Sequence, residues 1–191
     1  MTILEAVKQS AFNLQLENIA NINSESEVGG LNDSDKLEFD NLIRCAHQVL
    51  KEIAAEYVPL VTNQSFNLTN NEIDFKDFCK PILEVIRVSF NGKRIPFVSF
   101  HDRIELGIKG GGNFTVEYAY DIDFNHDLNA ELDYKSKKVS VRLLGFGIAA
   151  EYCLINGMND EAILWDRRYK DALGAAVSQR KEKKVKVRRW L

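Results

Sequence analysis

The chain has 191 residues, of which 45% are hydrophobic, and a formal net charge of −3 at pH 7. These values fit one ordinary domain or two small ones that share a core, and they exclude a wholly disordered chain. Only 3 Pro and 11 Gly exclude a collagenous or proline-rich protein. Because the sequence has no run of about 18 apolar residues and no cleavable apolar leader at Met1, we expect a soluble intracellular protein.

The charge is unevenly distributed along the chain. Residues 180–191 contain seven basic residues and one glutamate, a net charge of +6. The other 179 residues carry 18 basic and 27 acidic side chains, a net charge of −9. An acidic body that ends in a basic segment indicates an interaction tail.

Residues 1–20 are predicted to form an N-terminal helix, because their apolar residues recur at spacings of three and four. The residues that define this spacing are Ile3, Leu4, Val7, Ala11 and Leu14. Residues 21–35 are polar and contain Ser, Asn and two adjacent glycines, which favours a linker. We therefore expect the first helix to be mobile relative to the rest of the chain.

Residues 36–60 and 136–178 are predicted to form a helical bundle. The first of these segments carries one apolar stripe with helical period, and Pro59 is expected to end its helix. This stripe consists of Phe39, Leu42, Ile43, Ala46, Val49, Leu50, Ile53, Ala54 and Tyr57. We expect it to pack against the second segment.

The second segment is predicted to contain two helices joined by a tight turn. Residues 137–156 are apolar nearly all round, which indicates a helix buried on several sides. The apolar residues are Val139, Val141, Leu143, Leu144, Phe146, Ile148, Ala149, Ala150, Tyr152 and Leu154. Asn156–Gly157 is expected to end this helix and Asn159 to cap the next one. In the resulting antiparallel hairpin we expect Phe146 and Trp165 to face one another.

Residues 61–135 read as an inserted antiparallel β lobe. Ile82–Phe90 is the best strand, and Asn91–Gly92 is the strongest short hairpin signal in the chain. The return strand is expected over Lys93–Phe100, with Pro96 marking an edge position or a bulge. Further strands are predicted near 61–68, 72–75, 103–108 and 114–120. The predicted fold class is therefore α+β, with a long helix, a C-terminal helical hairpin, a β lobe and an extended arm over residues 179–191.

The cysteine and histidine patterns select no catalytic site. Cys45, Cys79 and Cys153 are widely spaced and odd in number, which favours reduced, buried thiols. His47 and His101 are read as solvated side chains, because no nucleophile can be assigned beside them. We therefore expect no enzymatic activity, no catalytic residue and no cofactor.

Two short segments resemble ligand loops without completing them. Lys109–Asn113 is rich in glycine, but a strand follows it where a phosphate loop needs a helix, so a hairpin turn is expected. Asp121–Asp127 has oxygen side chains at alternate positions, like the first half of a calcium loop. It has His126 where the loop needs glycine and Leu132 where it needs glutamate. We expect an acidic surface loop with no bound metal and no calcium dependence.

The basic C-terminal segment admits three readings. It can be a disordered tail, a nucleic-acid contact in which Trp190 stacks on bases, or a protein-docking arm. Protein docking is favoured, because Val and basic residues alternate as in a strand added to a sheet, and Trp190–Leu191 adds an apolar anchor. The proposed partner-binding residues are Lys183, Lys184, Val185, Lys186, Val187, Arg188, Arg189, Trp190 and Leu191.

Gly145–Cys153 resembles the penultimate helix of head–tail connector (neck or adaptor) proteins of tailed bacteriophages. Asp160–Trp165 is similar to the helix that follows in those proteins, and Arg188–Leu191 is similar to their extended terminal arm. The strand-rich insertion between helices is similar too. The resemblance covers residues 35–191, and the segment before it is not part of the family pattern.

The resemblance implies a structural protein in the neck of a virion, made in the cytoplasm of the bacterial host. In the family, a ring of usually twelve copies lies beneath the portal protein and continues the channel through which double-stranded DNA passes. Its arms or helices dock on the portal, and its β lobe meets the next tail or neck component. No membrane contact is implied. Two alternatives stay open: a nucleic-acid-binding protein that uses the basic tail, and a small intracellular enzyme without a recognisable motif.

Overall fold

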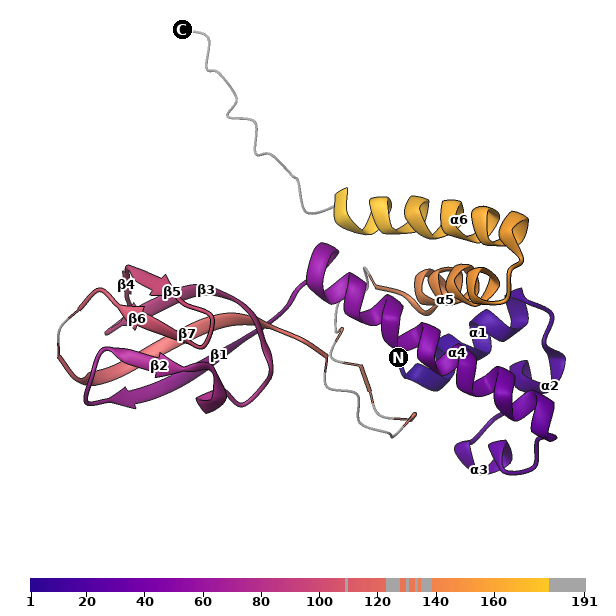
Figure 1. Cartoon of the computed structure of the whole chain (residues 1–191), viewed down its shortest axis with the longest axis horizontal. Helices are drawn as coiled ribbons and strands as arrows, with labels where there is room; N and C mark the ends of the chain where they lie inside the picture. The colour runs from indigo at the N-terminus through magenta and orange to yellow at the C-terminus, as the bar shows by residue number, and fades with distance from the viewer. Residues whose placement is uncertain (109, 123–127, 130, 133, 135–138, 179–191) are drawn as a thin grey trace, which may run out of the picture. The chain divides into compact units, whose positions relative to one another are not determined.

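The computed structural model describes residues 1–108, 110–122, 128, 129, 131, 132, 134 and 139–178. Its fold class is α+β, with helices and antiparallel sheets as the sequence predicts. The chain divides into two compact units (Figure 1). The helical unit comprises Met1–Val49 and Asp127–Leu191, and the strand unit is Leu50–His126.

The described helices are α1 (Ile3–Asn13), α2 (Glu17–Ala20), α3 (Glu25–Val28), α4 (Asp33–Glu52), α5 (Val141–Ile155) and α6 (Asn159–Ser178). The predicted long helix is α4, and it continues as a short π-helical segment, Ile53–Tyr57, before Pro59. None of these helices combines the length and the apolar character needed to cross a membrane.

The predicted N-terminal helix is broken in the middle. A capping box closes its N-terminus: the Thr2 hydroxyl accepts a hydrogen bond from the Glu5 backbone amide, and the Glu5 carboxylate accepts one from the Thr2 backbone amide. Its end lies at Asn13, and Gln15 then adopts a left-handed conformation with φ of 61°. Because an α-helix cannot continue through a positive φ, α2 starts as a separate turn.

The expectation that the first helix is mobile is wrong for the described residues, since α1 packs against α5. Gly145 on α5 allows this contact: a Cβ at that position would lie 2.6 Å from the Gln9 Cγ. The Asn13 side-chain amide also donates to the Gly145 carbonyl at 3.4 Å. The α1 backbone is held at its start as well, where the Leu4 amide donates to the Leu128 carbonyl. An apolar face as long as that of α1 is stable only when covered, and α5 covers it.

The segment expected to be a linker, residues 21–35, is partly helical. It contains α3 and the first residues of α4. Ile22 is buried, and the Asn18 side chain donates to the Asp35 carboxylate at 2.8 Å. These contacts anchor the segment within the helical unit.

Individual side chains of α4 and α5 touch one another. A Cβ at Gly147 would lie 2.8 Å from a Val49 methyl and 3.0 Å from the Tyr169 ring. The Tyr152 hydroxyl of α5 donates a hydrogen bond to the Glu38 carboxylate of α4. The small side of α5 therefore lets α4 and α6 approach its backbone closely.

The described part of the strand unit holds seven strands in two antiparallel sheets. They are β1 (Leu60–Leu68), β2 (Glu72–Asp74), β3 (Ile82–Phe90), β4 (Lys93–Ile95), β5 (Phe97–Ser99), β6 (Arg103–Leu106) and β7 (Gly112–Tyr120). One sheet has the order β1-β7-β3-β4 and the other β2-β6-β5. Buried side chains from both sheets fill the core of this unit: Ile73, Ile104, Leu106, Val88, Phe114 and Val116.

The Asn91–Gly92 hairpin is confirmed, and both turn residues have positive φ, 50° and 75°. The return strand is shorter than predicted, because Pro96 divides it into β4 and β5, which belong to different sheets. Proline has no amide hydrogen to donate to a ladder, so the chain leaves the first sheet at this residue.

The predicted hairpin turn at Gly110–Gly112 is wrong, because β6 and β7 belong to different sheets and do not pair. The glycines instead carry the chain from one sheet to the other. A Cβ at Gly111 would lie 2.4 Å from the Leu68 carbonyl oxygen, so this position requires glycine for close backbone approach.

Candidate functional site

The described residues with the strongest signs of a binding site lie on the α5–α6 hairpin. The turn between these helices forms as predicted, with Gly157 at φ 71°. The amides of Asn156, Gly157 and Met158 donate to carbonyls in the last turn of α5. Because α6 begins at Asn159, this residue lies inside the first helical turn and not at the cap predicted for it.

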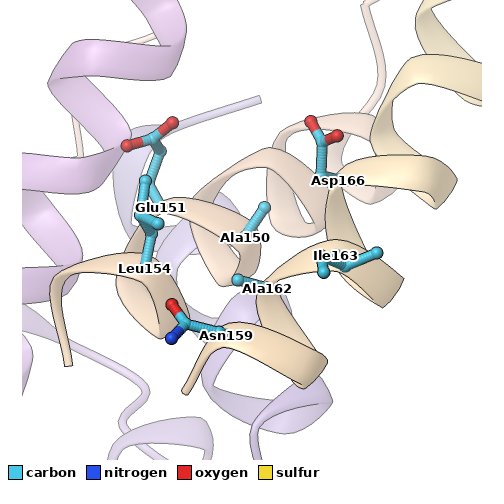
Figure 2. A pocket seen from close by; sticks show the side chains of 7 residues that line it. All are labelled: Ala150, Glu151, Leu154, Asn159, Ala162, Ile163 and Asp166. Atoms are coloured by element: carbon cyan, nitrogen blue, oxygen red, sulfur yellow. The ribbon is translucent and has the colours of Figure 1, made fainter. Parts of the chain in front are cut away.

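A groove of about 450 Å³ lies between α5 and α6. Figure 2 shows Glu151 and Asp166 on opposite sides of Ala150, with Ala162 and Ile163 nearby. Leu154 and Asn159 complete the lining. The groove is therefore mainly apolar, with a carboxylate on each side. This is the chemistry of a site that takes an apolar group flanked by cations.

Large apolar side chains are exposed around the same turn. Leu154 and Ile155 of α5 are each 58% exposed, Ile163 of α6 is 69% exposed and Leu164 is 49% exposed. Single exposed apolar residues are ordinary, but a cluster of them marks an interaction surface. We call these four residues the hairpin patch.

The hairpin patch was not predicted from the sequence. Leu154 was expected among the buried residues of a helix that is apolar all round, whereas Leu154 and Ile155 at the end of α5 are exposed. Ile163 and Leu164 carried a usable signal, because they fall outside the apolar stripe of α6 that begins with Ala162 and Trp165.

The charge near the groove is mainly acidic. Asp160 and Glu161 lie in the first turn of α6, where carboxylates interact favourably with the helix dipole. Asp166 accepts from the Lys170 ammonium at 2.6 Å, and both side chains are well exposed. Such an exposed pair contributes little to stability, so Asp166 can exchange Lys170 for another cation at small cost.

A second groove, of about 660 Å³, also lies between α5 and α6 and contains aromatic and arginine side chains. The Phe146 and Trp165 rings stack with centroids 5.8 Å apart. The Arg142 guanidinium lies over Phe146 at 5.3 Å from its centroid, and Arg168 lies over Trp165 at 4.7 Å. Asp171 also lines this groove. Trp and Arg are the residue types that most often carry binding energy at interfaces.

The partner-binding residues proposed from sequence, Lys183–Leu191, lie outside the described residues. So do residues 123–127 of the segment that resembles a calcium loop; in the same segment, the described Asp121 pairs with Lys51 at 3.7 Å. Within the described part of the chain, no three His, Cys, Asp or Glu side chains gather as metal ligands would.

The structure places His101 and the three cysteines. His101 is exposed, and its Nδ1 lies 3.5 Å from the Asp102 carboxylate. All three cysteines are described and none forms a disulfide. Cys45 and Cys153 are buried as expected, whereas Cys79 is exposed, which corrects the expectation for that residue.

No protein-family model matches this sequence, and no curated protein matches it.

Proposed function

We propose that this protein is a structural adaptor of a tailed-bacteriophage neck, without enzymatic activity. The observation that carries the proposal is the hairpin patch, in which Leu154, Ile155, Ile163 and Leu164 are exposed around one turn. A surface of this kind is suited to being covered by another protein. The same hairpin contains Gly145–Cys153 and Asp160–Trp165, the segments that resemble connector proteins.

In this role, copies of the chain form a ring of twelve below the portal protein and continue the DNA channel. The C-terminal arm and the hairpin contact the portal or a neighbouring copy, and the strand unit contacts the next tail component. The net charge of −9 over residues 1–179 supports a channel role, because each phosphate contact would slow the transient passage of DNA.

A second candidate function is nucleic-acid binding. It is favoured by Arg142 and Arg168, which flank two stacked aromatic rings, together with the basic segment 180–191. Arginine and aromatic side chains together bind single-stranded nucleic acid through phosphate charge and base stacking. The adaptor is preferred because Asp171 shares the groove and the hairpin patch carries no charge.

The test of the adaptor function is incorporation into particles. Virions purified from a host that expresses a tagged copy of the protein are expected to contain it at the neck, and deletion of its gene is expected to leave heads without tails. Absence of the protein from tailed particles would overturn the proposal.

Two variants separate the adaptor from the nucleic-acid binder. Trp190→Ala combined with deletion of Leu191 keeps every basic residue of the arm but removes its apolar anchor. Charge reversal at Lys183, Lys184 and Lys186 keeps the anchor. The adaptor requires the first variant to fold normally and fail to enter particles. If only the charge reversal is harmful, and lowering the salt concentration changes its effect, nucleic-acid binding is the function.

A further inference from the structure

The groove between α5 and α6 has an apolar floor that the described residues leave open, and the chain itself contains a segment with matching chemistry. We propose that this groove binds the C-terminal segment, residues 179–191, of a second copy of the chain. Val187 or Trp190 enters between Ala150, Ala162 and Ile163, and basic residues of the segment pair with Glu151 and Asp166. The inference rests on the proposed adaptor function, because it names the partner of the arm.

Charge complementarity supports this choice of occupant. The groove has two carboxylates, Glu151 and Asp166, on opposite sides of its floor (Figure 2). Asp160 and Glu161 add two exposed carboxylates at the adjacent start of α6. The segment that would enter has a net charge of +6 over residues 180–191. Over residues 184–188 basic residues alternate with valines, so an extended backbone would place Val185 and Val187 on one side and three cations on the other. Trp190 would lie on the same side as those cations.

The size of the groove also suits this segment. A volume of about 450 Å³ is within the range of sites that take one bulky group, and Trp190 is the largest apolar group that the segment offers. Leu154 and Ile163 extend the apolar surface beyond the groove, so the neighbouring Leu191 or Val187 has a surface to cover.

The segment of a second copy fits the groove better than the segment of the same chain. The groove lies at the start of α6, whereas residues 179–191 follow the end of α6. Ile163 and Ser178 are 15 residue steps apart, which is about 22 Å along the helix. The 13 residues from 179 to 191 can span about 43 Å, so distance alone does not prevent return. Return would need a reversal directly after Ser178, and the segment has no Gly, Pro, Asn, Asp or Ser to make a turn.

Like charges oppose the same return path. A segment that folded back along its own α6 would pass Arg167, Arg168 and Lys170 before it reached the groove. A segment from another copy can approach the groove from the acidic start of α6 without passing these residues. Exchange of segments between copies therefore brings opposite charges together and keeps like charges apart.

Cross-linking between two chains that each carry one engineered cysteine tests the proposal. Both full-length chains carry Cys79→Ser, so that no exposed native thiol competes. One chain also carries Ile163→Cys in the groove, and the other carries Val187→Cys in the segment. After mixing and treatment with a short bismaleimide, we expect a covalent dimer of the two chains. The matched control replaces Ile163→Cys with Val98→Cys, an apolar residue of the strand unit that is 59% exposed. We expect about a tenfold higher yield from the groove pair than from the control pair.

Two further variants show whether the contact has the proposed chemistry. In the first variant, the Ile163→Cys chain also carries Glu151→Gln and Asp166→Asn. In the second, the Val187→Cys chain also carries Trp190→Ala. Each variant is expected to lose most of the cross-linked product. Glu151 and Asp166 are at least partly exposed and Trp190 lies beyond α6, so folding is expected to be retained, and circular dichroism checks this.

Three results would overturn the inference. Cross-linking within one chain that carries both cysteines, with none between mixed chains, would show that the segment returns to its own groove. Equal yields from the groove pair and the control pair would show random collision. Absence of product, together with normal incorporation into particles, would show that a different protein covers the groove, and the adaptor function would stand without this contact.

Discussion

The rings of Phe146 on α5 and Trp165 on α6 stack across the C-terminal hairpin, with centroids 5.8 Å apart and an angle of 26° between their planes. This contact confirms the pairing that the two apolar stripes predict. Both rings are half-buried, and Arg142 and Arg168 cover their outer sides. The pair therefore joins the packing of the hairpin to its arginine-rich groove.

Trp165→Ala is expected to lower the free energy of unfolding by about 2–3 kcal/mol. Truncation of a fully buried Trp costs about 3–5 kcal/mol, and a half-buried ring loses less apolar contact. Urea denaturation followed by circular dichroism measures the change. Trp165→Phe retains a ring against Phe146 and is expected to recover more than half of the loss. An unchanged midpoint for Trp165→Ala would show that this stacking does not hold the hairpin together.

Gly147→Ala and Gly174→Ala are expected to change stability in opposite directions. A methyl at Gly147 would collide with Val49 and the Tyr169 ring, at a cost of about 1–3 kcal/mol. A methyl at Gly174 meets nothing within 4 Å, and alanine in an exposed helix is about 0.5–1 kcal/mol more favourable than glycine. Thermal melts of the two variants give both signs in one experiment. Stabilisation by both substitutions would mean that α5 does not approach α4 and α6 as closely as described.

The three cysteines are expected to differ in their reaction with an aromatic disulfide reagent at pH 8. Burial, together with the negative charge of Glu151, raises the pKa of the Cys45 thiol to about 11, and burial also raises the pKa of the Cys153 thiol. Cys79 is exposed. One thiol per chain should therefore react quickly, and two more should react after unfolding in guanidinium. Cys79→Ser should abolish the fast phase, and a fast phase that survives this change would place Cys45 or Cys153 at the surface.

The Tyr152–Glu38 hydrogen bond is expected to make stability fall at high pH. Burial, and then the bond donated to the Glu38 carboxylate, raises the pKa of the Tyr152 phenol above its usual value. Above about pH 10 the unfolded phenol loses its proton while the folded one keeps it, so the unfolded state binds fewer protons. The stability contribution is complete below pH 10 and declines as the pH rises toward the folded pKa.

The measurement is the urea midpoint of the native protein and of Tyr152→Phe between about pH 8 and 11. The native protein should lose stability more steeply than the variant above pH 10, and the difference between the two curves isolates Tyr152 from the other tyrosines. Parallel curves would contradict a raised pKa for this phenol.

Elements with local sequence signals could be predicted from the sequence. The apolar stripe from Phe39 to Tyr57 predicted α4, since side chains three and four residues apart share one helix face. Asn91–Gly92 predicted the β3–β4 turn, because these two residues tolerate positive φ. The Phe146–Trp165 contact was also predictable, because a short turn forces two amphipathic helices to pack antiparallel.

Features that depend on contacts between distant parts of the chain could not be predicted from the sequence. The sequence around α1 does not reveal that Gly145, more than 130 residues away, provides the surface on which it packs. Likewise, Pro96 predicted an irregularity, but the change of sheet at that residue depends on where β6 lies.

The candidate site divides in the same way. Ile163 and Leu164 lie off the apolar stripe of α6, which local periodicity can detect. The exposure of Leu154 could not be detected in this way. An apolar residue in an apolar helix is buried only where another element of the protein covers it. In this protein the last two residues of α5, Leu154 and Ile155, are each 58% exposed, and burial is a property of the packed partners and not of the residue itself.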